Sequence, residues 1–355
     1  MMQASDGFTS LFDGRTLAGW IAADGPEPAF YVHDGAIVGG PASGYPAWLR
    51  SQRQYENFDF RCEFFVQGWT DGGVYFHAPE HGLKSRCGFK ISIFQQQDAE
   101  PRTNSMGSIF PLIAPRKVNV RNRGEWNSLR IQMDWPALRV WVNGEQVHDV
   151  DVDQHPDLRF RLRSGYLGLE TLSYPIRFRN LGIRELPGKS HWQPLFRGPE
   201  DLVNWTVTES NPRAPARFEA SGAVLRGDGL GNLVTREKFR DFALQLYIRG
   251  SRHHNGGILF RSSPHYEIQL HDVEESHYPT GSLYHFRRSS YPRIESEQWF
   301  LFQMWVKERW CLVRINGENV MEYDRLENLN EGPIALQAHD AGRWIDYKDI
   351  LVRRD

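Results

Sequence analysis

The chain has little of what marks several large classes of protein. Its 42 basic and 44 acidic residues leave a formal net charge of -2, so no basic field favours binding to nucleic acid. No apolar run approaches the ~20 residues that a membrane span needs. The N-terminal residues lack the apolar stretch of an export signal, so the chain as given is expected in the cytoplasm; removal of a leader would instead mean export.

Cysteine is also scarce. The three cysteines, Cys62, Cys87 and Cys311, cannot all pair, and none shows the Cys/His spacing of a zinc site. Cys62 and Cys87 could meet on neighbouring strands, but free cysteine is common in protein cores, and we expect buried thiols.

What the chain does contain is a long internal repeat. The segment Phe58–Gly72 is matched by Phe242–Gly256, and Trp126–Asn143 is matched by Trp299–Asn316, with identical spacings. A period of about 180 residues is far too long for a solenoid unit and has the size of a whole domain. We therefore predict two homologous domains.

Both copies have the pattern of short β-strands. Apolar and polar residues alternate in Phe58–Phe64, and the pairs Asn143-Gly144 and Asn316-Gly317 separate β-branched runs, which is the strongest short-range hairpin signal. Such a pattern allows a closed barrel or a two-sheet sandwich, and the alternation favours a sandwich with one wet face. The prediction is all-β, with two tandem jelly-roll domains over residues 1–187 and 188–355.

Polar side chains follow one face of a strand in the second copy. Period-two alternation over Tyr266–Asp272 puts Glu267, Gln269 and His271 opposite the apolar positions. Arg261 has the same phase on the preceding strand, and Gln337 and His339 have it in a later strand. If these strands share a sheet, their side chains could converge on one polar surface.

A solvated sheet face would show the same alternation without any function. The first copy keeps the apolar phase but not these polar side chains: its corresponding residues are His77, Lys90, Ser92, Phe94, Glu170 and Leu172. A residue needed for folding should be kept in both copies. We therefore expect the site in the second domain and a degenerate site in the first.

Four motifs of the second copy carry a resemblance to a known family. They are G-G-I-L-F-R (256–261), Y-E-I-Q-L-H-D (266–272), T-G-S-L-Y (280–284) and G-P-I-A-L-Q-A-H-D (332–340). In this order and spacing, the chain resembles the 3-keto-disaccharide hydrolase (DUF1080) family over nearly its whole length, as two tandem copies. The resemblance implies a concanavalin A-like jelly roll, related in shape to family 16 glycoside hydrolases.

The resemblance implies action on glycosides already oxidised at C3 of the sugar. A base removes the C2 hydrogen, which the ketone acidifies, the group at C1 leaves by β-elimination, and water can add back. Glu267 and His339 would be base and acid in an open order, and Arg261 or Gln269 would stabilise the enolate. The remaining substrate-binding candidates are His271, Tyr284 and Gln337.

A cofactor is not required by this route. A divalent cation held by Glu267, Asp272 and His339 could instead polarise the ketone. The tandem histidines His253 and His254, just before the next strand, are more typical of an ordinary loop than of a metal site.

Three alternatives stay open at this point. Ordinary glycosidase chemistry needs two carboxylates, and Gln269 stands where a second acid would follow Glu267, which leaves Asp340 or Glu274. A non-catalytic, lectin-like module would bind a carbohydrate without a base. Both copies could also serve assembly alone. In each carbohydrate-directed case the expected partner is a glycoside.

Overall fold

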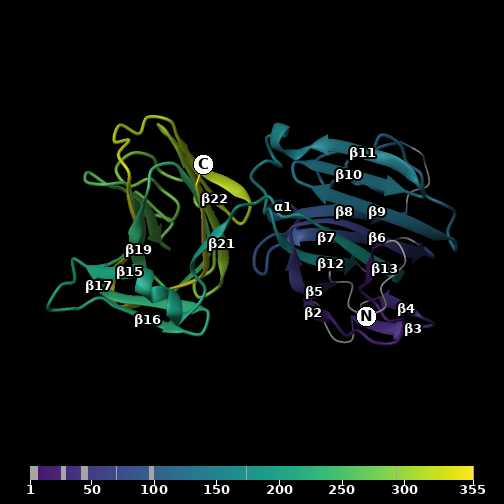
Figure 1. Ribbon diagram of the computed structural model, residues 1–355, viewed down its shortest axis with the longest axis horizontal. Coiled ribbons are helices and arrows are strands. Elements are labelled where there is room, and N and C mark those ends of the chain that lie inside the picture. The colour runs from purple at the N-terminus through teal and green to yellow at the C-terminus, as the bar shows by residue number, and fades with distance from the viewer. Residues whose placement is uncertain are drawn as a thin grey trace. The chain divides into compact units, whose positions relative to one another are not determined.

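The computed structural model describes residues 7–24, 29–40, 47–68, 70–95, 100–172, 174–292 and 294–354, which form β-strands for the most part (Figure 1). Two compact units divide the chain, Met1–Ser190 and His191–Asp355. The last residues before the division belong to the first unit because Glu56 accepts hydrogen bonds from Ser190 N at 2.7 Å and Ser190 Oγ at 3.0 Å.

Two antiparallel sheets make up the first unit. The larger contains β1 (Thr9–Ser10), β3 (Phe30–His33), β4 (Ala36–Gly39), β6 (Asn57–Val66), β9 (Trp126–Asp134), β10 (Ala137–Val142), β11 (Glu145–Asp151) and β13 (Ile176–Leu186). Its order is β11-β10-β9-β6-β13-β4-β3, with β1 paired to β13. The smaller contains β2 (Trp20–Asp24), β5 (Ala47–Tyr55), β7 (Asp71–Ala78), β8 (Phe89–Phe94) and β12 (Gly165–Thr171), in the order β2-β5-β12-β7-β8.

The second unit repeats this topology. Its strands are β14 (Gln193–Phe196), β15 (Trp205–Thr208), β16 (Arg217–Ser221), β17 (Val224–Phe239), β18 (Phe242–Gly250), β19 (Asn255–Phe260), β20 (Tyr266–His271), β21 (Phe300–Lys307), β22 (Trp310–Ile315), β23 (Glu318–Tyr323) and β24 (Gly332–Arg354). Both β17 and β24 run through two layers, so β24 pairs with β19 through its first half and with β18 through its second. One layer is β15-β17-β24-β19-β20 and matches β2-β5-β12-β7-β8 strand for strand. The predicted class of two tandem jelly rolls is confirmed.

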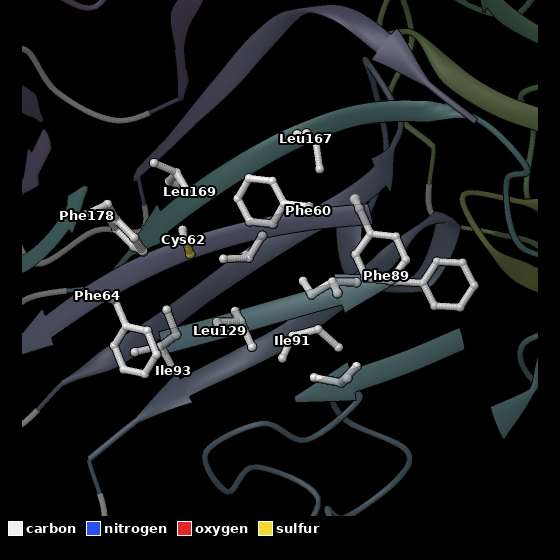
Figure 2. Close-up of a cluster of buried hydrophobic side chains, with 14 of the residues drawn as sticks. Phe60, Cys62, Phe64, Phe89, Ile91, Ile93, Leu129, Leu167, Leu169 and Phe178 are labelled. Carbon is white, nitrogen blue, oxygen red and sulfur yellow. The ribbon is translucent and has the colours of Figure 1, made fainter. Parts of the chain in front are cut away.

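Each unit closes around its own apolar core. Figure 2 shows that of the first unit, where Phe60, Cys62 and Phe64 of β6 meet Ile91 and Ile93 of β8 from the other sheet. The corresponding cluster of the second unit includes Phe242, Ile258, Ile268 and Leu336. Burial of these alternating positions removes one face of every central strand from water and drives the two sheets together. The three cysteines are buried and form no disulfide, as expected.

Local sequence signals are repeated as structure. Asn143-Gly144 and Asn316-Gly317 are two-residue hairpin turns in which all four residues have positive φ. Trp20 and Trp205 are buried and donate from Nε1 to the carbonyls of Leu11 (2.8 Å) and Leu195 (3.0 Å), respectively.

The other repeated tryptophans lie outside the core. Trp126 and Trp299 are half-buried under arginine side chains, with the Arg179 Cζ 3.8 Å and the Arg249 Cζ 4.7 Å from the respective ring centroids. The repeat therefore preserves a cation–π contact at this position and not a core residue.

Helical structure is sparse in the part of the chain that the structure describes. It consists of α1 (Lys84–Cys87) and the 3₁₀ turns η1 (Val152–Gln154) and η2 (Pro199–Asn204). Across the described ranges, we find no helix with the length and apolar character for crossing a membrane.

Candidate functional site

The sheet β20-β19-β24-β17 brings most of the predicted polar side chains to one face. Gly257 of β19 pairs with Gln269 of β20 on one side and with Gln337 of β24 on the other, and Gln337 pairs with Asn232 of β17. Glu267 and His271 share this phase on β20, because they lie two residues to either side of Gln269. We call this surface of the four strands the site face; its opposite side is the core.

Glu267 occupies the space that a side chain on Gly257 would fill. A Cβ built on Gly257 would lie 2.5 Å from Glu267 Oε1 and 2.8 Å from Glu267 Cγ. The carboxylate thus lies over Gly257 on β19, with Gln269 on one neighbouring strand and Gln337 on the other. Burial in this position raises the pKa of Glu267 to about 7, and no charged neighbour contributes to the shift. A half-ionised carboxyl group near neutral pH can act as a base or as an acid.

Amide side chains lie in register on the strands around Gly257. Gln269 is buried and donates from Nε2 to Asn255 Oδ1 at 2.7 Å. Asn232 donates from Nδ2 to Glu209 Oε2 at 2.8 Å, which brings another carboxylate to the edge of the site face. Sequence analysis missed Asn232 and Glu209, because the pairing of β17 with β24 joins residues far apart in the chain and no local sequence pattern predicts it.

His339 lies on the site face but not on the strand next to Glu267. By strand spacing, the Cα atoms of Glu267 and His339 are about 16 Å apart, since β19 lies between their strands. The carboxylate of Glu267 leans over Gly257, however. Gly257 and His339 lie on neighbouring strands, two residues apart in register, which corresponds to about 8 Å. The His339 imidazole is exposed on the same face.

The other candidates on this face differ in how they are held. His271 Nδ1 lies 3.2 Å from Ser276 Oγ, and burial lowers the pKa of His271. Tyr284 bonds through its backbone N–H to the carbonyl of Glu267 at 2.9 Å, and its ring is partly exposed beside Tyr278, with centroids 5.2 Å apart.

The structure places Arg261 away from the site face. The backbone leaves the strand at this residue with a φ of +64°, so the period-two phase no longer applies. The buried guanidinium donates to the carbonyls of Asn328 and of Glu308 (2.7 Å) and lies 3.4 Å from Asp241. Arg261 therefore does not join the other predicted residues on the site face, and its side chain ties loops together instead.

Asp272 also faces away from Glu267. Its carboxylate accepts a hydrogen bond from Ser296 Oγ at 2.8 Å and lies 3.8 Å from His254 Nδ1, beyond the end of β20. Within the described ranges no three His, Cys, Asp or Glu side chains converge as a metal site. Glu267, Asp272 and His339 are thus not assembled as the expected cation ligands.

The first unit fills the same space with an ion pair. Gly73 of β7 pairs with Glu170 of β12 and with Ser92 of β8, and Lys90 leans over Gly73 as Glu267 leans over Gly257. Lys90 Nζ lies 2.5 Å from Glu170 Oε2, and Tyr75 Oη donates to Glu170 Oε1 at 2.7 Å. Lys90 and Glu170 are both buried. Sequence comparison revealed both substitutions but not that their charges compensate each other.

Comparisons with known proteins agree with the repeated fold. A family model described as a 3-keto-alpha-glucoside-1,2-lyase-like domain matches residues 7–184 and again 191–353. A 3-keto-disaccharide hydrolase of Bacteroides thetaiotaomicron is 24% identical over 231 residues, which cover 51% of this chain and 79% of that protein.

Solved structures resemble one half of the chain. A candidate glycosyl hydrolase from Parabacteroides distasonis has 20% identity and a TM-score of 0.45, and the match covers 52% of this chain and 95% of that one. The carbohydrate-binding module CBM66 from Bacillus subtilis has 11% identity and a TM-score of 0.36, with 47% of this chain and 95% of that one covered.

Substitution of Glu267 tests its burial through stability alone. Between the ordinary value of 4.5 and about 7, the folded protein binds a proton at Glu267 that the unfolded chain has lost, so folding stability falls as pH rises through this window. We expect Glu267→Gln to raise the free energy of unfolding by up to about 3 kcal/mol near pH 8 and by little near pH 5. Urea unfolding at both pH values measures this, with Glu219→Gln, an exposed carboxylate, as a variant without the effect.

Substitution of Lys90 tests the ion pair of the first unit. Lys90→Met leaves the Glu170 carboxylate buried and uncompensated, so we expect a loss of about 3–5 kcal/mol in urea unfolding. Lys90→Met with Glu170→Gln should recover most of this loss. Lys117→Met removes an exposed ion pair to Glu145 and should change stability by less than about 1 kcal/mol. Equal effects of the two lysine variants would contradict the buried pair.

Proposed function

The chain belongs to the family of 3-keto-alpha-glucoside-1,2-lyase-like domains, and we propose that its second unit cleaves glycosides that carry a ketone at C3. As a member of this family it is a carbohydrate-active, glycosyl hydrolase-like protein. The observation that carries the finer proposal is the carboxyl group of Glu267, which is half-ionised near neutral pH and faces an amide-lined surface.

Glu267 acts as the base. Its ionised form removes the C2 hydrogen, whose acidity comes from the neighbouring ketone, and the electron pair forms an enolate at C2 and C3. The enolate then expels the group at C1, which leaves a C1–C2 double bond conjugated to the ketone. The pKa of about 7 makes Glu267 a stronger base than an ordinary carboxylate while it remains ionised in part at neutral pH.

His339 donates the proton that the leaving oxygen needs. It flanks the same sugar from β24, about 8 Å in the plane of the sheet from the Glu267 carboxylate. Gln269 and Gln337 lie in register on either side of Gly257 and bind the hydroxyls or the developing enolate oxygen. Water then adds to C1 and a proton to C2, which gives net hydrolysis.

Tyr284 completes the sugar-facing surface. Its equivalent in the repeat is Phe110, whose ring lies 4.8 Å from Lys90 Nζ and whose N–H bonds to the carbonyl of Lys90. Tyr284 makes the same backbone bond to Glu267, and because Leu283 pairs with Ile268, alternation gives Tyr284 the same face as Glu267. A ring in this position offers an apolar face to the sugar.

Turnover of a 3-keto-glucoside tests the base directly. We expect Glu267→Gln to lower kcat about 10²- to 10⁴-fold with little change in affinity for the sugar, and Glu219→Gln to have wild-type activity. For the wild type, kcat/KM should fall as pH drops below about 7, because Glu267 is then protonated. Cleavage of the unoxidised parent glucoside alone would remove the eliminative route. Binding without cleavage of either compound would identify a lectin-like module.

The close approach to Gly257 gives a second test. Gly257→Ala adds a methyl group that would clash with the Glu267 carboxylate, so this carboxylate must move away from its position between Gln269 and Gln337. We expect a loss of about 10²-fold in kcat, since a displacement of the order of 1 Å is enough for such an effect. The base limb of the pH profile should also shift to lower pH as Glu267 becomes more hydrated. Thermal unfolding of the variant serves as the control for folding, and an unchanged profile would place the base elsewhere.

A further inference from the structure

A polar cavity lies beyond the end of β20, outside the site face. Its volume is about 510 Å³, and its polar lining comes from His253, Asp272, Glu274, Glu275 and Tyr291. The cavity is within the size range of small-molecule sites. None of its lining residues takes part in the reaction proposed above.

Asp272 presents a buried acceptor without a hydrogen-bond partner at this cavity. Its side chain is 3% exposed, and only Oδ2 is satisfied, by Ser296 Oγ at 2.8 Å. His254 does not complete the pairing, because its Nδ1 lies 2.9 Å from the carbonyl of Ser251 and 3.8 Å from Asp272 Oδ1. Burial lowers the pKa of His254, which disfavours a charged imidazole beside Asp272.

Two further carboxylates add to the negative charge. Burial raises the pKa of the Tyr291 hydroxyl, and the charges of Asp272, Glu274 and Glu275 raise it further. All three carboxylates are therefore close enough to the Tyr291 hydroxyl to interact with it electrostatically. This field excludes an anionic ligand and favours a cation.

Two arginines of the described residues near the cavity have partners elsewhere. Arg288 donates from Nη2 to the carbonyls of Glu274 at 2.7 Å and Ser276 at 3.3 Å, which holds the loop in place. Arg343 pairs with Asp340 at 3.3 Å and donates to the carbonyl of His253. Both guanidiniums thus contact backbone oxygens around the cavity and do not pair with its carboxylates in these contacts.

We propose that this cavity binds a protonated amine carried by a sugar-sized molecule, such as an amino sugar. The ammonium group donates to Asp272 Oδ1, and the charges of Glu274 and Glu275 stabilise it, with the Tyr291 ring and hydroxyl available to the sugar. A bare metal ion fits less well, because no three carboxylate or imidazole groups of the described residues converge as a metal site. The proposal does not depend on the reaction at Glu267.

Binding of D-glucosamine to the full chain tests the site, measured by calorimetry at low ionic strength and slightly acidic pH. D-glucose and N-acetyl-D-glucosamine are the matched ligands without a positive charge, and calcium chloride tests a metal. We expect saturable binding of glucosamine only, weakened about tenfold or more by Asp272→Asn and by added salt. Glu219→Gln and Glu267→Gln should bind as the wild type does, which separates this site from the proposed active site.

Several outcomes would overturn the proposal. Equal binding of glucose and glucosamine would show that the charge is not recognised, and calcium binding that requires Asp272 would identify a metal site. Unchanged affinity in Asp272→Asn would place the amine elsewhere. If Asp272→Asn fails to fold, the double variant Glu274→Gln/Glu275→Gln on the exposed loop gives the same test, and its wild-type affinity would count against the site.

Discussion

The close packing of the Glu267 carboxylate on the backbone of Gly257 is the contact on which the candidate site depends. A glycine in the middle strand leaves one niche on the site face, and the neighbouring strand fills it from the side. Because the niche is lined by backbone and amides, the carboxylate loses water without gaining a cation, which raises its pKa. The same packing positions the carboxylate between Gln269 and Gln337. The absence of a side chain at Gly257 therefore determines both the pKa and the position of the Glu267 carboxylate.

In both units a side chain of the neighbouring strand packs over the glycine, but its charge differs between the two units. In the first unit Lys90 enters from β8 and meets Glu170 across Gly73. In the second unit Glu267 enters from β20, and Gln337 takes the position of Glu170 in the register. The pairs are coupled: a glutamate at position 90 beside Glu170 would place two carboxylates together and push both pKa values up. A lysine at position 267 beside Gln337 would be buried without a counterion. The identities on the two flanking strands therefore depend on each other within each unit.

Much of this architecture was predictable from the sequence, and the failures have local causes. The repeat gave two jelly rolls, and the phase of Tyr266–His271 placed Glu267, Gln269 and His271 on one face, because alternation holds while a strand is regular. It fails where the strand ends, so Arg261, with its positive φ, turns inward instead. The order of the strands is a long-range property, so neither β19 between Glu267 and His339 nor Asn232 opposite Gln337 could be read from the sequence.

The end of β20 also explains how neighbouring residues come to serve two different environments. His271 is the last residue in phase with Glu267 and stays on the site face, while Asp272 points the other way and is held by Ser296. Had the strand continued in phase, Asp272 would face the apolar core, where a carboxylate is costly to bury. The turn of the chain after His271 instead directs this carboxylate to a separate cavity, where negative charge is useful for binding a cation and harmless to the proposed chemistry at Glu267.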